Sequence, residues 1–102
     1  MQTTYRTVGV AGAGAMGRGI AQIAAQAGST VRLYDTQPQA VARARDELFS
    51  QWDRLFEKGR MDAAGVAASK ARVHGAATLA ELADCDLVVE AIVERLDVKK
   101  AL

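Results

Sequence analysis

Short apolar runs alternate with amphipathic stretches along the 102 residues of this chain. Continuous apolar runs rich in valine, leucine and isoleucine are typical of parallel strands that are covered on both faces. Three such runs span Thr7–Ala11, Thr30–Tyr34 and Leu87–Ile92, and Val73–Ala76 is a weaker candidate. Strands that are separated by helical patterns predict an α/β domain with a parallel sheet.

The segment after the first strand has helical periodicity. Apolar residues recur at three- and four-residue spacing over Ala15–Ala27. Gly28 follows at the position where a helix commonly ends on a left-handed residue. We therefore expect one helix between the first two strands.

A long helix is expected after the second strand. Thr36 and Gln39 match a capping box, and Pro38 falls in the first turn, where its missing N–H does no harm. Gly59 is the expected end of this helix. An apolar stripe predicts its core face and consists of Val41, Ala44, Leu48, Trp52 and Leu55, with Phe49 and Phe56 beside it.

A second, shorter helix should pack against the long one. Asp62 is placed to cap a helix over Ala63–Lys70, so the two helices predict a helical hairpin. Thr78 and Glu81 match another capping box, which opens a short helix through Leu82 before the last strand.

The turn between the first strand and the first helix is rich in glycine. It is a G-x-G-x-x-G pattern of Gly12, Ala13, Gly14, Ala15, Met16 and Gly17. The first glycine permits a tight turn, the second lets the backbone approach a phosphate, and the third lets the helix pack close to the strand. The free N–H groups and the positive dipole end of the helix then favour a dinucleotide pyrophosphate. The pattern alone is weak, but the strand before it and the helix after it make it specific.

Asp35 ends the second strand, roughly 20 residues after the glycine turn, where dinucleotide-binding domains place an acidic residue. A carboxylate there can accept hydrogen bonds from the adenosine ribose and repel the extra phosphate of NADP. Thr36 offers no cation to that phosphate, so NAD is the favoured cofactor. The plainer alternative is that Asp35 only ends a strand near a helix cap.

These features predict a Rossmann-type α/β fold. A chain of this length can hold one half of a doubly wound parallel sheet and the start of the second half. We expect a truncated sheet of about four strands in the order 3-2-1-4, with the helical hairpin after the second strand. Residues 1–102 are then the N-terminal part of one NAD-binding domain.

Charge and cysteine content narrow the possible partners. The chain has 13 basic and 12 acidic residues and no basic block, so neither nucleic acid nor a membrane surface is an expected partner. The apolar stretch over 8–27 contains Arg18 and several glycines, which argues against a signal peptide or a membrane span. The single cysteine, Cys85, allows no intrachain disulfide and fits a cytoplasmic protein. No metal site is expected.

Two blocks of the sequence resemble the L-3-hydroxyacyl-CoA dehydrogenase family, which includes the 3-hydroxybutyryl-CoA dehydrogenases. The first block is VGVAGAGAMGRGIA over 8–21, and the second is DLVVEAIVE over 86–94, followed by VKK over 98–100. The resemblance implies that NAD also contacts the segment after the last strand, through Ile92, Val93, Glu94 and Lys99. For Glu94 and Lys99, the alternative is a solvated charge pair.

The same resemblance assigns Lys58 to the CoA part of the substrate. The alternative is that Lys58 only solvates the outer face of the long helix, as its neighbouring charges could. Those neighbours are Arg43, Arg45, Arg54 and Arg60.

The resemblance implies an enzyme that oxidises L-3-hydroxyacyl-CoA to 3-oxoacyl-CoA with NAD, in fatty-acid or related acyl-CoA degradation. Its catalytic histidine, catalytic loop and C-terminal helical domain for substrate binding and dimerisation would lie beyond Leu102, so no catalytic residue is expected here. The family's position for that base does not match His74, and Cys85 has no base partner in the sequence. The 102 residues alone should be inactive, and the full-length protein should be a homo-oligomer.

Two alternatives stay open. One is another NAD(P)-dependent hydroxyacid dehydrogenase with the same glycine turn, although the second block fits such families less well. The other is a non-catalytic dinucleotide-binding protein, such as the crystallin relatives of this family.

Overall fold

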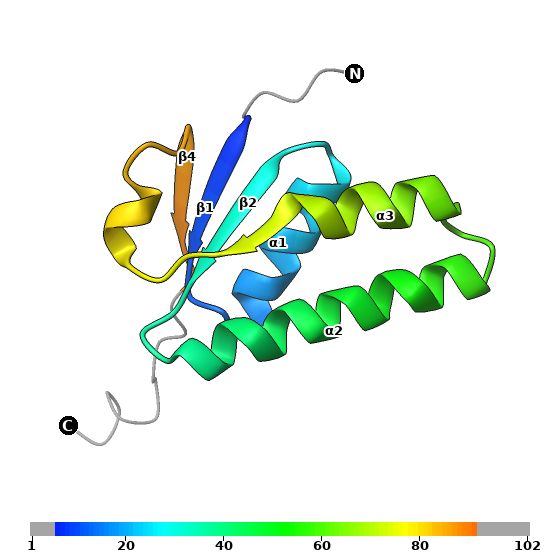
Figure 1. Cartoon of the computed structure of the whole chain (residues 1–102), viewed down its shortest axis with the longest axis horizontal. Coiled ribbons are helices and arrows are strands. Elements are labelled where there is room, and N and C mark those ends of the chain that lie inside the picture. The colour runs from blue at the N-terminus through cyan, green and yellow to red at the C-terminus, as the bar shows by residue number, and fades with distance from the viewer. Residues whose placement is uncertain (1–5, 92–102) are drawn as a thin grey trace, which may run out of the picture.

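The computed structural model describes residues 6–91, which include a four-stranded parallel sheet (Figure 1). Its strands are β1 (Thr7–Ala11), β2 (Thr30–Tyr34), β3 (Val73–Gly75) and β4 (Leu87–Glu90). They lie in the order β3-β2-β1-β4, and all three strand pairs are parallel. The predicted fold class and the predicted order 3-2-1-4 are therefore confirmed.

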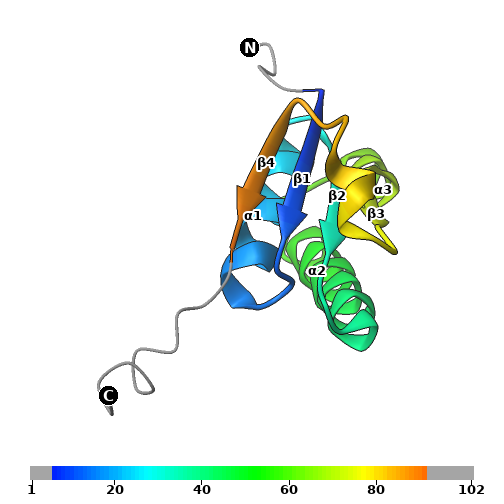
Figure 2. The ribbon, with the colours of Figure 1, turned by 90° about the vertical axis from the view of Figure 1, so that its left-hand side faces the viewer.

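Helices cover the two faces of the sheet unequally. Figures 1 and 2 show α1 (Ala15–Gln26), α2 (Pro38–Glu57) and α3 (Ala63–Arg72) on one face, and the 3-10 helix η1 (Leu79–Leu82) on the other. The chain crosses from β3 over β2 and β1 to reach β4. As a result, the carboxyl ends of β1, β2 and β4 meet at one edge of the sheet, where α1 and α2 also begin.

The main core lies between the sheet and the helices α1 and α2. Leu33 of β2 is fully buried beside Leu48 and Trp52 of α2. The Trp52 indole N–H donates to Gln26 Oε1 at 2.8 Å, so the one polar atom of this large side chain is satisfied. The predicted apolar stripe is confirmed over most of its length, but Phe56 is 49% exposed and does not join the core.

The α2–α3 hairpin is closed by the predicted signals. Gly59 adopts a φ of 72°, a left-handed conformation that suits glycine just after a helix. Asp62 caps α3 by accepting the Gly65 N–H at 2.7 Å. Arg72 Nη1 donates to the Ala25 carbonyl at 2.8 Å, which joins the end of α3 to α1.

The predicted capping box at the start of α2 is wrong. The helix starts at Pro38, so its N-cap is Gln37 and not Thr36, and Gln39 does not reach the N3 position. The Gln37 N–H is instead satisfied by Asp35 Oδ1 at 2.9 Å. The second predicted box, formed by Thr78 and Glu81, is confirmed at η1.

The last strand is shorter and less buried than expected. β4 ends at Glu90, and Ala91 still donates its N–H to the Ala11 carbonyl at 2.8 Å, while Ile92 lies outside the described residues. Val88 is 44% exposed because β4 is an edge strand of the described sheet and η1 covers only part of that face. Three other bounds also shift: α1 and β3 end one residue earlier than predicted, and α3 ends two residues later.

Candidate dinucleotide-binding site

A cleft of about 560 Å³ opens at the carboxyl ends of β1, β2 and β4. In open parallel sheets ligands bind at this edge, next to the point where neighbouring strands connect in opposite directions. Here that point lies between β1 and β4. The lining residues are Ala11, Gly12, Gly14, Tyr34, Asp35, Thr36, Gln37, Leu79, Glu90 and Ala91.

Two glycines of the turn are required by its geometry. Gly12 has a φ of 120°, a conformation that side chains rarely tolerate, and its N–H donates to the Tyr34 carbonyl at 2.7 Å. A Cβ on Gly17 would lie 1.7 Å from the Gly12 carbonyl oxygen. These observations confirm the expected tight turn and the close approach of α1 to it.

Gly14 is different, because the fold itself does not require a glycine there. Its φ of −78° and ψ of −166° suit any residue, and a Cβ built on it would meet nothing within 4 Å. Gly14 lines the cleft, so the space that a Cβ would fill is open to a ligand. This is the space that the backbone must leave free if a pyrophosphate is to approach it.

The start of α1 lies next to that space. Gly14 is the N-cap, and the first bond of the helix runs from the Arg18 N–H to the Gly14 carbonyl at 2.9 Å. The amides of Ala15, Met16 and Gly17 therefore have no acceptor within the helix. No side chain caps this end, and its first turn has no acidic residue. The site fits a bound anion, which would satisfy the amides and the positive end of the helix dipole.

Asp35 connects the cleft to the glycine turn. Its Oδ2 accepts the Ala13 N–H at 2.8 Å, and its Oδ1 accepts the Gln37 N–H at 2.9 Å. These two hydrogen bonds, the one from Ala13 first, lower the pKa of the Asp35 carboxyl, while partial burial opposes the shift. Asp35 is thus a carboxylate at neutral pH, and it favours a ribose diol over a phosphate at this position.

Several lining residues were not predicted. Glu90 pairs with Ala11 in the parallel register, so its place follows once β4 is known to lie beside β1. Leu79 is 56% exposed and comes from the crossover between β3 and β4. No local pattern indicates where that crossover passes, so Leu79 could not be found from the sequence.

The structure does not bring every expected residue to the cleft. Lys58 follows the last turn of α2, a helix of 20 residues, and thus lies about 30 Å from the start of that helix at the cleft. Ile92, Val93, Glu94 and Lys99 lie outside the described residues.

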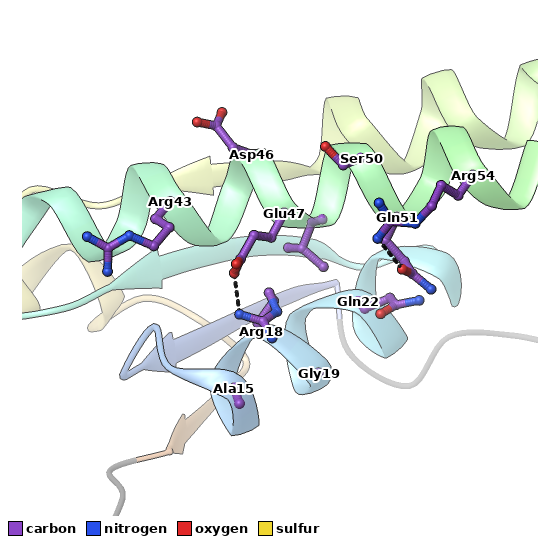
Figure 3. A pocket seen from close by; sticks show the side chains of 11 residues that line it. Ala15, Arg18, Gly19, Gln22, Arg43, Asp46, Glu47, Ser50, Gln51 and Arg54 are labelled. Atoms are coloured by element: carbon purple, nitrogen blue, oxygen red, sulfur yellow. Dashed lines mark hydrogen bonds and ion pairs between the residues drawn. The ribbon is translucent and has the colours of Figure 1, made fainter.

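A second groove, of about 570 Å³, runs between α1 and α2 (Figure 3). Arg18, the cation nearest to the glycine turn in the sequence, forms an ion pair with Glu47 across this groove. Arg43 and Arg54 line the same groove from α2. The only cation close to the turn in sequence is therefore directed toward α2, so an anion at the start of α1 would meet backbone groups.

Other candidate chemistry is sparse within residues 6–91. This part of the chain contains no cluster of three or more metal-ligating side chains that could hold an ion. Burial raises the pKa of the Cys85 thiol, which disfavours the reactive thiolate. Of the helices in this part, none has the length and apolar character needed to cross a membrane.

Comparison with known proteins assigns the family. Residues 7–102 match the family described as "3-hydroxyacyl-CoA dehydrogenase, NAD binding domain". The chain is 39% identical over its whole length to 3-hydroxyadipyl-CoA dehydrogenase of Escherichia coli K12, covering 22% of that protein. It is 43% identical to a probable 3-hydroxybutyryl-CoA dehydrogenase of Deinococcus radiodurans over 92% of the chain and 34% of the relative.

A solved structure extends this agreement to the fold. The 3-hydroxybutyryl-CoA dehydrogenase structure from Escherichia coli K12 superposes with a TM-score of 0.86 at 38% identity, covering 97% of this chain and 21% of that one. The chain thus spans about a fifth to a third of the length of these relatives. NAD is the cofactor that the family description gives for the matched domain. The chain belongs to the NAD-binding domain family of the 3-hydroxyacyl-CoA dehydrogenases.

Proposed function

We propose that these residues form the cofactor half of an enzyme that oxidises L-3-hydroxyacyl-CoA to 3-oxoacyl-CoA. The proposal depends above all on the unpartnered amides at the start of α1, which lie beside the open space at Gly14 and next to the Asp35 carboxylate. The names of the relatives support the substrate class, since they include dehydrogenases for 3-hydroxybutyryl-CoA and 3-hydroxyadipyl-CoA.

Each part of the site has a defined role in this proposal. The backbone of Gly12, Ala13, Gly14, Ala15, Met16 and Gly17 binds the pyrophosphate of NAD. Asp35 accepts hydrogen bonds from the adenosine ribose and disfavours NADP. Ile92, Val93, Glu94 and Lys99 contact the cofactor farther along. When bound, NAD supplies the hydride acceptor, and the protein holds it in place.

Lys58 is proposed to contact the CoA part of the substrate, far from the reacting carbon. Arg54 and Lys58 are four residues apart and therefore lie on the same side of α2. Arg54 lines the α1–α2 groove, which gives an elongated CoA with its phosphates a path along the helix toward Lys58.

We place the catalytic base outside these 102 residues. The only histidine, His74, is exposed on β3 and does not line the cleft. The fatty-acid oxidation complex subunit of Pseudomonas savastanoi, 34% identical over 91% of the chain, supports a role in fatty-acid or related acyl-CoA degradation. The proposed full-length enzyme is cytoplasmic and forms a homo-oligomer.

Calorimetric titration with NAD and NADP tests the cofactor site. The chain should bind NAD more tightly than NADP, and Asp35→Ala should weaken NAD binding by about tenfold and reduce the preference, because the lost ribose bonds are charge-assisted. Asp53→Ala, which removes a carboxylate near the far end of α2, is the control and should leave both affinities unchanged. Unchanged NAD affinity in Asp35→Ala contradicts the assigned ribose contact. Formation of 3-oxoacyl-CoA by the chain alone contradicts the placement of the base.

A further inference from the structure

We infer that Asp35 is also a positioning residue, which holds the glycine turn in its phosphate-binding shape before any cofactor is present. The inference rests on the proposed dinucleotide site. It adds a second role to a residue whose expected partner is the ribose: through Ala13, Asp35 would also determine how well the backbone binds the pyrophosphate.

The contacts of Asp35 join three segments at one point. The residue ends β2, and its two oxygens accept N–H groups from Ala13 in the turn and from Gln37 before α2. The neighbouring bond from the Gly12 N–H to the Tyr34 carbonyl attaches the turn to the same strand end. Two consecutive amides of the turn are therefore fixed to β2 just before Gly14, which lines the cleft and caps α1.

The Ala13 amide lies beyond the backbone pairing of β1 with β2, and the Asp35 side chain is its acceptor. Ala13 is 5% exposed, and the register of β1 with β2 ends at the pair of Ala11 and Tyr34. A buried amide that loses its acceptor carries a desolvation cost, which favours a rearranged turn. The Asp35 carboxylate removes that cost and stabilises the observed turn.

This role leaves room for the ribose. An ionised carboxylate has about four acceptor positions. The two strong bonds, to Ala13 and Gln37, take one position on each oxygen, and the weaker contact with the Thr36 hydroxyl at 3.5 Å takes a third at most. Holding the turn and binding a ribose hydroxyl are compatible at the same side chain.

Inorganic pyrophosphate separates the two roles because it has no ribose. If Asp35 only contacted the ribose, Asp35→Ala would leave pyrophosphate binding unchanged, or strengthen it by removing a negative charge next to an anion. If Asp35 holds the turn, the same change removes the acceptor of the Ala13 N–H and should weaken pyrophosphate binding by about tenfold, because fewer molecules have the turn in its phosphate-binding shape. Pyrophosphate binding is therefore weakened only if Asp35 holds the turn, whereas a contact with the ribose alone leaves it unchanged or strengthens it.

The experiment is a pyrophosphate titration of the ¹⁵N-labelled chain, followed at the amides of Ala15, Met16 and Gly17. Asp86→Ala is a matched control, because Asp86 Oδ2 also accepts two backbone amides, those of Arg6 and Thr7, but at the opposite end of the strands. The control should bind pyrophosphate like the wild-type chain. Equal or tighter binding by Asp35→Ala overturns the inference and leaves the dinucleotide site intact.

Hydrogen exchange in the unmodified chain provides a second test that needs no variant. Without cofactor, the Ala13 amide should exchange slowly, as an amide held by a carboxylate does. Fast exchange at Ala13 overturns the inference. Failure of the wild-type chain to bind pyrophosphate would contradict the dinucleotide site itself, and the inference with it.

Discussion

The cofactor cleft and the α2–α3 hairpin are built in opposite ways. The cleft consists largely of backbone, with glycines where side chains would interfere and one carboxylate that holds the turn. The hairpin is held by large side chains, above all the buried Trp52, and by contacts such as that of Lys70 with Asp53. Adding atoms should therefore damage the cleft, whereas removing atoms should damage the hairpin.

The largest effect is expected for Gly17→Ala. The new Cβ would lie 1.7 Å from a backbone oxygen, and neither α1 nor the turn can move away without breaking the contact with β1. The loss should be at least about 4 kcal/mol, enough to unfold a small domain. Urea unfolding followed by circular dichroism measures it. Gly19→Ala on the same helix, where a Cβ meets nothing within 4 Å, should instead gain about 0.5–1 kcal/mol.

Removal of the central side chain of the hairpin should come next. Trp52→Ala should lower the free energy of unfolding by about 3–5 kcal/mol, because a fully buried aromatic ring is lost. Trp52→Phe keeps most of the ring but loses the bond to Gln26, so about 1–2 kcal/mol is expected. NAD affinity should not change in Trp52→Phe. A loss of NAD affinity there would show that the two regions are coupled.

Gly14→Ala should separate folding from binding. Its backbone conformation suits alanine and the added Cβ has space, so the free energy of unfolding should change by less than about 1 kcal/mol. NAD should bind at least about tenfold more weakly, a loss of about 1.4 kcal/mol, because the Cβ occupies the approach of the pyrophosphate. Urea unfolding measures the change in stability, and calorimetric titration with NAD measures the change in affinity. Unchanged NAD affinity would mean that the ligand does not approach Gly14.

Acid should remove the stabilisation that Asp35 provides. The pKa of Asp35 in the folded state lies below its ordinary value. The stabilisation that Asp35 provides is therefore fully present at a pH above the ordinary pKa, and it is lost as the pH falls through the lowered pKa of the folded state. The difference in unfolding free energy between the wild-type chain and Asp35→Asn should be about 1 kcal/mol at pH 7 and should shrink below about pH 4. A pH-independent difference for Asp35→Asn would contradict the assigned hydrogen bonds.

The smallest effect is expected at the surface of the hairpin. Asp53→Asn removes an exposed ion pair with Lys70 and should cost about 0.5 kcal/mol or less, an effect that salt should abolish. Lys70→Ala should cost more, because the Lys70 ammonium also lies 5.5 Å from the centre of the Phe49 ring. Equal losses in the two variants would show that the ring contact contributes nothing.

Features with a local physical cause could be predicted from the sequence. The apolar runs and the glycine turn indicated the strands and the location of the cofactor site, because strand and helix periodicity and the needs of a tight turn are local. The strand order followed from the Rossmann topology that this turn indicates. Asp35 was expected at the cleft because it ends the strand next to β1.

Other features depend on how the elements pack. The N-cap of α2 is Gln37 and not Thr36, so the predicted cap is wrong by one residue. The Gln37 N–H, which would be the first amide of a helix capped by Thr36, instead donates to Asp35. Arg18 turns to Glu47 only because α1 and α2 lie side by side. Leu79 reaches the cleft through the crossover, whose path no local pattern determines.

The position of Trp52 has a practical consequence for spectroscopy. It is the only tryptophan in the chain, and it sits fully buried where α2 meets the end of α1 through Gln26. Intrinsic fluorescence excited at the indole therefore has a single origin and reports whether the hairpin is docked. A red shift in emission that precedes the loss of the circular dichroism signal would reveal undocking of the hairpin while the sheet is still folded.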